Sequence, residues 1–547
     1  LDGIARENGR EEYGLRLNVN QKGLDDKLNV QLNLATNINK ANLLGGGAWE
    51  SESTKNPTLS NFNDDGSYRF DLTSTNEYAR LAQQTSYRKQ QTSSADAKAD
   101  LEIVKGLKAS IFGSVQRNSY TDGQYRLKAS EDSMENTDFP GGGYAYKGDF
   151  LEQKYALEPT IQYENTFADK HKITAIGGYS YRYEIQEASS LENRGFINDV
   201  FHEDNIGAGA ALGVGKAGMS SSKSDNTLIA FFGRVNYVFN DKYMAQFILR
   251  HEGSSKFGKN NRWGNFPAVS LGWNMSQENF MKDVKFINYL KLRAGYGMTG
   301  NAPTANNVSR VMLGGGGKYL YPDGSYYETY GPTTNYNPDL KWESKRELNI
   351  GVDFTMFDNK LTGSLDVFNR KTKDLLDRYT SPQPPYVVRE IWTNVGTFSS
   401  KGIELALGYK AITTEDFSWN TNLTASTTKN VMDSYSNSQY VVKFIQKGDI
   451  QGAGDLGQAF TIFEGKEIGV FYGKRFAGFT DDGKWLFYNR NGEKVRNDQI
   501  NNSRDDLNAT DLAPIGNAVP KYYASWANNF RYKNFDLSIF LRGKFDF

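Results

Sequence analysis

Apolar and polar side chains alternate over segments of about ten residues along most of the chain. In the segment 401–410, one parity is mainly apolar and the other mainly polar, as the neighbours Glu404 and Leu405 illustrate. Side chains alternate between the two faces of a β-strand, so each such segment is predicted to be a strand with one apolar face and one polar face. The same split recurs at 13–20, 28–34, 348–356 and 537–542.

Short turns and long polar stretches separate these strands in a regular order. Gly, Asn, Asp and other polar residues form tight turns at 23–26, 105–106, 168–170, 240–241, 358–359, 413–416 and 533–534, and a slightly longer eighth connection lies near 283–287. Long polar stretches lie at roughly 39–97, 119–152, 185–225, 300–343, 371–398 and 430–520, with a short exception near 253–264. Short turns at one rim and long loops at the other are typical of an outer-membrane β-barrel, with the short side in the periplasm.

A soluble all-β protein is the alternative, because its half-buried strands also alternate. Charged residues at the polar positions of the strands, such as Arg293 and Glu404, could face either the water-filled lumen of a barrel or the solvent around a soluble protein. The long loops favour the barrel, since compact soluble domains rarely contain so many. No stretch approaches the ~20 apolar residues of a transmembrane helix. The mean hydropathy is −0.64, yet the chain has 33 Tyr and 33 Phe.

Aromatic residues beside the short turns add to this picture. Tyr237, Phe239 and Tyr243 flank the turn at 240–241. Such residues would form an interfacial girdle in a barrel, and ordinary strand propensity is the other explanation.

Composition narrows the functional classes. The 64 basic and 64 acidic residues give no net charge and no indication of a nucleic-acid binder. Cysteine is absent, which removes disulfides, thiolate metal sites and a cysteine nucleophile. Of the three histidines, His202 and His251 could each belong to a catalytic site, but nothing in their spacing indicates one, and we predict a protein that is not an enzyme.

Carboxylates in the long stretch before Pro514 could in principle bind a hard cation such as Ca²⁺. They are Asp481 and Asp482 with Gly483, Asp505, Asp506 and Asp511. Their spacing does not match an EF-hand loop, and solvated turns are the more common explanation. We predict neither a metal site nor a cofactor.

The strand pattern starts within a few residues of Leu1 and is still running at Phe547. A barrel in lipid must close, because an open edge leaves backbone groups unpaired. Eight hairpins supply about sixteen strands, whereas plugged transporters have about 22. We therefore expect residues 1–547 to be a partial barrel, with an amino-terminal plug and the final strands outside this chain. A terminal Phe that marks the end of a barrel is the alternative.

Four groups of short motifs occur in a set order. They are the stretch Arg250–Pro267 with Gly272-Trp273 and Glu278–Phe280, the stretch Asn337–Glu343 with Asn349–Asp353, the stretch Leu361–Asp366 with Arg370–Leu376, and the stretch Asn394–Gly396 with Lys401–Glu404. In this order they resemble the SusC/RagA family of TonB-dependent outer-membrane transporters, most strongly from about residue 225 onwards. His251-Glu252-Gly253 stands where the family usually has Asp-Gly after the arginine, a mild departure.

The resemblance implies a location in the bacterial outer membrane, in contact with its lipid, and active import of large nutrients. Such cargo is commonly glycans and sometimes peptides, in Bacteroidota. It also implies a SusD-like surface lipoprotein as a lid and the TonB–ExbB–ExbD complex as the energy source, acting through a plug upstream of this sequence. A dimer of transporter–lipoprotein pairs is compatible with it. A passive porin or surface-binding barrel without energy coupling is the alternative function.

Aromatic residues in the long polar stretches are the candidate ligand-binding residues. They are Trp49, Tyr144, Tyr146, Tyr319, Tyr321, Tyr326, Tyr327, Tyr330 and Trp392. Flat aromatic faces can stack on sugars and are also favoured against a protein lid. Packing of one loop against another is the structural alternative.

Overall fold

Long antiparallel strands make up most of the protein. The computed structural model describes residues 3, 5, 8–44, 48–70, 75–437, 439–449 and 458–547. Among these residues, 17 strands belong to one antiparallel sheet, of which β21 (Lys466–Glu467) has only two residues and the other sixteen have 11 to 24. The all-β class and the number of about sixteen strands predicted from the sequence are confirmed. None of the described helices is long and apolar enough to cross a membrane.

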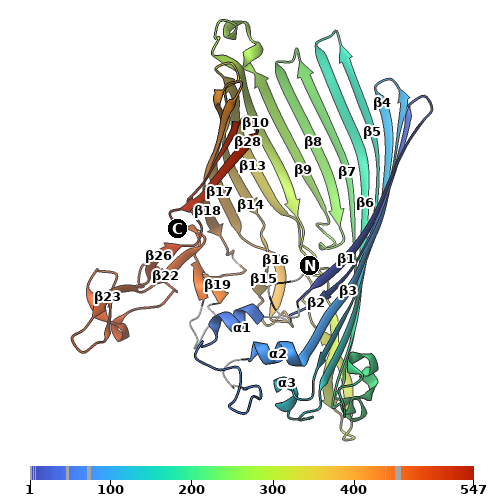
Figure 1. Cartoon of the computed structure of the whole chain (residues 1–547), viewed down its shortest axis with the longest axis vertical. Helices are drawn as coiled ribbons and strands as arrows, with labels where there is room; N and C mark the ends of the chain where they lie inside the picture. Colours follow the sequence, from blue (N-terminus) through green and yellow to red (C-terminus); the bar gives the residue numbers. More distant parts are fainter. Residues whose placement is uncertain are drawn as a thin grey trace. The chain divides into compact units, whose positions relative to one another are not determined.

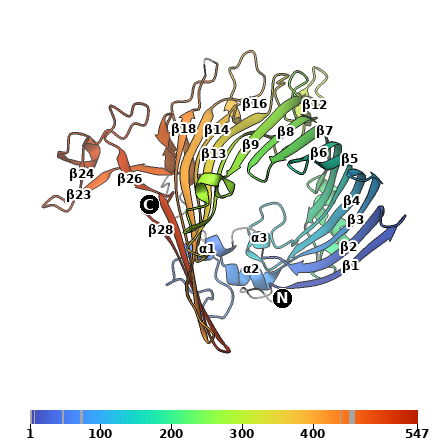
Figure 2. The ribbon, with the colours of Figure 1, turned by 90° about the horizontal axis from the view of Figure 1, so that it is seen from above.

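The chain divides into two compact units, residues 1–161 with 178–229 and residues 162–177 with 230–547. In the first unit, consecutive strands pair as antiparallel neighbours from β1 to β4 (Figure 2). Its strands, the last three of which continue into the second unit, are β1 (Arg10–Gly23), β2 (Leu28–Asn42), β3 (Gln84–Val104), β4 (Leu107–Arg126), β5 (Tyr144–Phe167), β6 (His171–Arg194) and β7 (Gly218–Phe239).

Short helices lie in the connections of the first unit. They are α1 (Ala48–Thr54), α2 (Glu77–Gln83), α3 (Glu131–Met134) and the 3₁₀ helices η1 (His202–Ala208) and η2 (Ala210–Val214). The three α-helices lie near one another, at the long-loop ends of the strands (Figure 1). The side chain of Asn76 caps α2 by accepting a hydrogen bond of 3.1 Å from the backbone N–H of Ala79.

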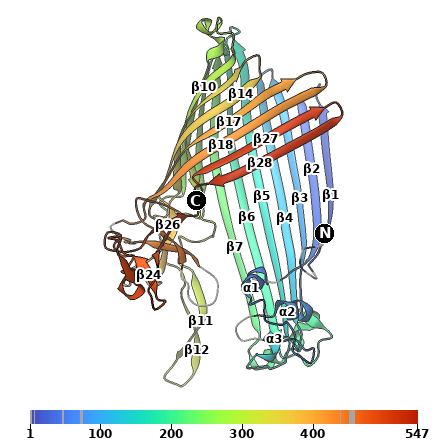
Figure 3. The same ribbon diagram turned by 60° about the vertical axis from the view of Figure 1, so that its left-hand side comes forward.

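In the second unit, neighbouring strands follow the order β8, β9, β10, β13, β14, β17, β18, β27 and β28 (Figure 3). Their bounds are β8 (Tyr243–Ser254), β9 (Trp263–Asn274), β10 (Ile287–Asn301), β13 (Glu343–Met356), β14 (Leu361–Lys373), β17 (Thr397–Thr413), β18 (Phe417–Ser434), β27 (Tyr522–Tyr532) and β28 (Phe535–Phe545).

The long connections of the second unit carry small sheets of their own. They are β11 (Leu313–Leu320) with β12 (Tyr326–Pro332), β15 (Leu376–Thr380) with β16 (Glu390–Asn394), β19 (Ile445–Asp449) with β20 (Gln458–Ile462), β22 (Val470–Gly473) and β26 (Ala513–Asn517), and β23 (Arg475–Phe479) with β24 (Trp485–Tyr488) and β25 (Lys494–Arg496). The 3₁₀ helix η5 (Asn497–Gln499) follows β25. Long polar stretches thus contain local pairing that their sequences did not indicate.

Seven of the predicted tight turns lie where expected, between consecutive strands. At the turn between β7 and β8, Asn240 and Asp241 have φ values of 53° and 56°. Two consecutive positive φ values are the geometry of a type I′ turn, which Asn and Asp adopt at little cost and which matches the twist of a hairpin.

The connection between β9 and β10 is longer than predicted and contains η3 (Met275–Gln277) and η4 (Asn279–Met281). Glu278 organises it, because its carboxylate accepts hydrogen bonds from Tyr243 (2.6 Å), Lys242 (3.0 Å) and Trp273 (3.2 Å). These bonds, that of Tyr243 foremost, lower the pKa of Glu278 to about 2. The Gly-Trp and Glu-Asn-Phe motifs therefore have a structural role at this turn.

Several strands extend farther than the sequence predicted. Residues 84–97, 119–126, 144–152, 185–194 and 218–225 were expected to be loop, yet they belong to β3, β4, β5, β6 and β7. Backbone ladder bonds do not require an apolar face, so pairing continues after the alternation of apolar residues has ended. The apolar face simply becomes polar towards the long-loop end of these strands.

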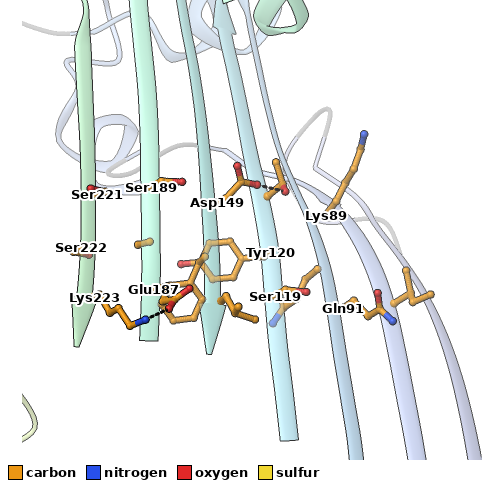
Figure 4. Close-up of a pocket in the computed structure, with 16 residues that line it drawn as sticks. Lys89, Gln91, Ser119, Tyr120, Asp149, Glu187, Ser189, Ser221, Ser222 and Lys223 are labelled. Carbon is orange, nitrogen blue, oxygen red and sulfur yellow. Dashed lines mark hydrogen bonds and ion pairs between the residues drawn. The ribbon is translucent and has the colours of Figure 1, made fainter. Parts of the chain in front are cut away.

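A shallow groove of about 790 Å³ in the first unit lies on this polar continuation (Figure 4). Ile38 pairs with Gln91 and Gln91 with Ser119, so their side chains share the face that is apolar nearer the short turns. Lys223 forms an ion pair of 2.7 Å with Glu187 across it. Charged side chains of both signs and hydroxyl side chains line the groove. This polar lining explains why the segments that form it were predicted to be loops.

Candidate functional site

The polar face of the second unit carries a network centred on Arg293 of β10. The guanidinium donates two hydrogen bonds of 2.6 Å to the two carboxylate oxygens of Asp366 on β14, and its Nε lies 3.1 Å from Asp353 on β13. Such a bidentate fork is the strongest arrangement of an Arg–carboxylate pair. Arg293 therefore links three strands through their side chains.

Gly351 makes this reach possible. It pairs with Arg293 on one side and with Asp366 on the other, so it lies directly between the two charged groups. A Cβ atom at Gly351 would lie 2.7 Å from both the Arg293 Cζ and an Asp366 carboxylate oxygen. The side chain of Arg293 crosses β13 at Gly351 to reach Asp366. This crossing explains the glycine in the motif Asn349–Asp353 and the aspartate that ends the motif Leu361–Asp366.

At the long-loop end, two motif stretches of the second unit are locked together. The backbone N–H of Gly258 donates a 3.1 Å hydrogen bond to the Leu340 carbonyl. A side chain at Gly258 would overlap with the carbonyl of Pro338. The indole of Trp342 packs against Phe257 at 4.5 Å between ring centroids and donates a 2.9 Å hydrogen bond to the carbonyl of Arg262. We call these two stretches, residues 257–262 and 335–342, the loop clamp.

Hydrogen bonds of two asparagine side chains join the loop clamp to the connection between β14 and β17, which contains β15 and β16. Asn337 donates to the carbonyl of Trp392 at 2.8 Å. Asn394 accepts from the backbone N–H of Lys341 at 2.9 Å and donates to the carbonyls of Lys341 and Asp374 at 2.7 and 3.0 Å. Amides with both a donor and an acceptor can replace backbone pairing where strands end. Three connections far apart in sequence are therefore held as one platform.

Replacing Asn394 by Ala should loosen this platform. Three backbone groups would lose their partner, which we expect to cost about 1–3 kcal/mol of local stability. Faster hydrogen exchange at 337–342 and 374–376, with the strands unchanged, is the expected result. The matched control is Asn491→Ala, whose exposed side chain lies outside the clamp. Equal exchange in both variants would contradict the role of Asn394.

A tyrosine cluster between β15 and the end of β18 is packed and is not a ligand surface. Tyr379 and Tyr440 are 3% and 6% exposed, and the ring of Tyr435 stacks 5.0 Å from that of Tyr379. Burial raises the pKa of Tyr379 and, together with its bond to Asp377, that of Tyr435, and burial raises the pKa of Tyr440 to about 12. These phenols stay neutral near neutral pH; the hydroxyl of Tyr379 donates to the carbonyl of Tyr435, and that of Tyr435 donates to the carboxylate of Asp377. This cluster therefore joins β15 to the segment that follows β18.

Five of the predicted aromatic candidates lie on the β11–β12 hairpin, which projects from the long-loop end of the second unit (Figure 3). Tyr319 pairs with Tyr327 and Leu320 with Tyr326, so tyrosines occupy both faces. The ring of Tyr321 lies 5.1 Å from that of Tyr327. The five side chains are 51% to 76% exposed: Tyr319, Tyr321, Tyr326, Tyr327 and Tyr330. We call this surface the tyrosine hairpin.

The remaining candidates have different surroundings. In the second unit, Trp392 is half-buried in β16 beside the clamp. In the first unit, Trp49 on α1 is 59% exposed. Tyr144 lies under the guanidinium groups of Arg126 and Arg194 and donates a 2.8 Å hydrogen bond to Glu192. Tyr146 is half-buried above Gly148 on the same strand.

The aspartates considered as cation ligands take part in turns. Asp482 pairs with Lys484 at 2.8 Å, and Asp511 accepts the backbone N–H groups of Arg490 and Asn501 at 2.8 and 2.7 Å. These bonds, that of Arg490 first, lower the pKa of Asp511. No group of three or more His, Cys, Asp or Glu residues able to hold a metal ion occurs among the residues the structure describes.

Known proteins with similar sequences place this architecture in a family. Residues 18–543 match the family model for the TonB dependent receptor-like β-barrel. TonB-dependent receptor P3 of Formosa agariphila is 29% identical over 89% of this chain and 48% of its own length. TonB-dependent receptor SusC of Bacteroides thetaiotaomicron is 26% identical over 77% of this chain and 40% of its own. The chain thus spans about half the length of these relatives.

A solved structure of the RagAB peptide importer in its closed-closed state has the same fold, with a TM-score of 0.80 and 19% identity over 99% of this chain and 58% of that one. These relatives are named as receptors or importers, so the prediction of a protein that is not an enzyme is confirmed. The predicted outer-membrane location and the resemblance to the SusC/RagA transporters are confirmed as well. The chain belongs to the TonB-dependent receptor-like β-barrel family of the bacterial outer membrane.

Proposed function

We propose that the protein to which this barrel belongs imports large nutrients across the outer membrane by a TonB-dependent mechanism, as the channel subunit of a SusCD-type complex. The match to the TonB-dependent receptor family over residues 18–543 carries this proposal. Energy coupling would come from TonB–ExbB–ExbD acting on a plug, and the residues 1–547 would form part of the barrel around it. Glycans and peptides are the proposed cargo classes, and one structure of this fold is that of a peptide importer.

We further propose that the long-loop ends receive cargo and a SusD-like surface lipoprotein. The loop clamp gives a fixed support, and the tyrosine hairpin offers rings that are 51% to 76% exposed. Exposed Tyr is favoured where one surface meets another, because its ring supplies contact area and its hydroxyl a hydrogen bond. Trp49, Tyr144, Tyr146 and Trp392 are proposed as secondary contributors. A dimer of transporter–lipoprotein pairs is the assembly we propose.

The decisive experiment is extraction of the native protein in mild detergent, followed by mass spectrometry of everything that co-purifies. A stoichiometric surface lipoprotein and a plug on the same polypeptide are the expected result. Any retained ligand would identify the cargo class. A plugless barrel that purifies alone would instead establish a passive porin or surface-binding barrel.

Changing Tyr326, Tyr327 and Tyr330 together to Ser should weaken retention of the co-purifying lipoprotein. Buried aromatic contacts of this kind each contribute about 1 kcal/mol or more to an interface, so we expect the retained fraction to fall at least tenfold. The control is Phe479→Ser, an aromatic side chain of similar exposure, 58%, outside the hairpin. Unchanged retention in the triple variant would exclude the hairpin from the interface.

A further inference from the structure

The apolar face of four neighbouring strands in the second unit, β13, β14, β17 and β18, becomes cationic at its long-loop end (Figure 3). Lys401 of β17 lies on this face, and its register partners are Asn369 on β14 and Lys429 on β18. One step farther from the short turns, Arg346 of β13 pairs with Lys371 of β14. We call the four exposed cationic side chains the cationic cluster: Arg346, Lys371, Lys401 and Lys429.

The opposite end of the same face is uncharged. The row of side chains next to the short turns is formed by residues that each pair with the next: Met356, Leu361, Tyr409 and Thr421. In a barrel this face contacts lipid, and the long-loop end lies on the outer side of the membrane. The positive charges on the lipid-facing wall of these strands are therefore placed towards the outer leaflet.

Strand length puts the cationic cluster at the level of the lipid headgroups. β17 ends at Thr413 beside a short turn, and Lys401 lies about twelve residues from that end. A strand that rises ~3.3 Å per residue and is tilted by ~40° climbs ~2.5 Å per residue, so Lys401 lies about 30 Å from the short-turn rim. The apolar band of a barrel is ~25 Å tall. Lys401 is therefore just beyond the outer edge of the hydrocarbon.

Carboxylates offset only half of the charge of the cationic cluster. Lys429 forms an ion pair of 3.1 Å with Glu467, and Lys371 forms one of 3.5 Å with Asp433. The other two members form no ion pair within the part of the chain that the structure describes. One of these two, Lys401, lies directly across from Lys429, where like charges destabilise a strand pair. A bound anion would remove this repulsion.

A shallow groove of about 400 Å³ joins the cationic cluster to the apolar band. Apolar side chains line the part nearer the short turns, and polar side chains line the other part: Ile350, Val367 and Ile403, then Asn369, Lys401 and Lys429. An acyl chain fits the first part, and a phosphate fits the second, because it accepts hydrogen bonds from ammonium and amide groups. Lysines that only reach from the edge of the lipid to water would need no such groove.

We propose that this groove binds a phosphorylated lipid of the outer leaflet, with the phosphate at Lys401 and Lys429 and close to Arg346. A phosphate monoester carries about 1.5–2 negative charges at neutral pH, which matches the two members of the cationic cluster without a carboxylate. The groove lies on the lipid-facing side of the sheet, and a plug would lie on the other side. A zwitterionic lipid would bring a further ammonium group to the cluster, and a free phosphate would leave the apolar part empty.

The test uses the full-length protein in dodecyl maltoside, washed free of native lipid, with lipid A as the probe and native mass spectrometry of bound lipid as the readout. The comparison probe is the same lipid A after its phosphates have been removed by a phosphatase. We expect the phosphorylated form to bind at least about tenfold more tightly, because charge-assisted hydrogen bonds hold its phosphate. An excess of inorganic phosphate should not displace it, since the acyl chains also contribute to binding.

A double variant tests the cationic cluster itself. Arg346→Gln with Lys401→Gln removes the two cations without a carboxylate, and it should reduce the preference for phosphorylated lipid A to about twofold or less. The matched control is Lys345→Gln with Lys410→Gln, which removes two exposed positive charges from the polar face of the same two strands, β13 and β17. This control should keep the preference of the wild-type protein, and Lys401→Arg should keep it too.

Equal binding of the two forms of lipid A by the wild-type protein would overturn the proposal. Displacement by inorganic phosphate would overturn it as well, because the cationic cluster would then be an adventitious anion site only. An equal loss of preference in the control variant would indicate a general response to net charge and would also contradict the assignment. If a second copy of the barrel covers this face, the wild-type protein will show no preference and Arg346→Gln with Lys401→Gln will change the oligomeric state. None of these outcomes involves TonB or a lipoprotein, so each would leave the import proposal standing.

Discussion

Replacing Leu405 by Arg is expected to destabilise the folded barrel by about 2–4 kcal/mol, the cost of a cation on the lipid face near the bilayer midplane. Leu405 lies at the middle of β17 (Thr397–Thr413), and its register partners Leu365 and Ala425 are apolar as well. The measurement is reversible folding of the full-length protein into lipid vesicles, followed by denaturant titration.

The adjacent residue supplies the control. Glu404 lies on the opposite, polar face, where its register partners are Asp366 and Ser426. Glu404→Leu should therefore change the free energy of unfolding by much less than Leu405→Arg. Equal tolerance at the two positions would contradict the assignment of the two faces. In a soluble sandwich Leu405 would face a core and Glu404 the solvent, so the two variants would keep the same order, and folding into lipid vesicles is what distinguishes the barrel.

Alternation and turn chemistry were sufficient to predict the strands that cross the membrane and most of the short turns. Both are local properties. The face on which Leu405 lies follows from the alternation of its neighbours, and the positive φ of Asn240 follows from the residue types of its turn, so neither depends on the rest of the fold. The start of β3 at Gln84 was missed because its outward side chains are polar, and pairing there depends on a partner strand. Hydrophobic periodicity reports burial in lipid, so it ends where the lipid ends.

The candidate site was only partly accessible to the sequence. Exposed tyrosines in a Gly-rich loop could be recognised, and five of them lie together on one hairpin. The role of Asn394 and the reach of Arg293 across Gly351 could not, since both depend on which strands and loops become neighbours. Lys401 was visible only as the first residue of a motif. Its place opposite Lys429 follows from the register of β17 and β18.

Replacing Arg293 by Met should destabilise the barrel by about 2–3 kcal/mol. Removing one partner of a buried ion pair costs about 3–5 kcal/mol, and partial access of water reduces this. The Arg293 and Asp366 side chains are 33% and 13% exposed, so the carboxylates of Asp366 and Asp353 would lose their partner in a place that water reaches only in part. The loss should appear as a lower midpoint of thermal unfolding in the full-length protein.

Two further variants separate the lost charge from the lost packing. Arg293→Lys keeps the charge but not the bidentate fork, and it should give an intermediate loss. Arg293→Met combined with Asp366→Asn removes one of the two stranded carboxylates, and it should recover part of the stability that Arg293→Met alone loses. If the combined variant were less stable than Arg293→Met by the full cost of Asp366→Asn alone, the two residues would be energetically independent. The network would then not hold β10, β13 and β14 together, and Gly351 would need another explanation than the passage of the Arg293 side chain.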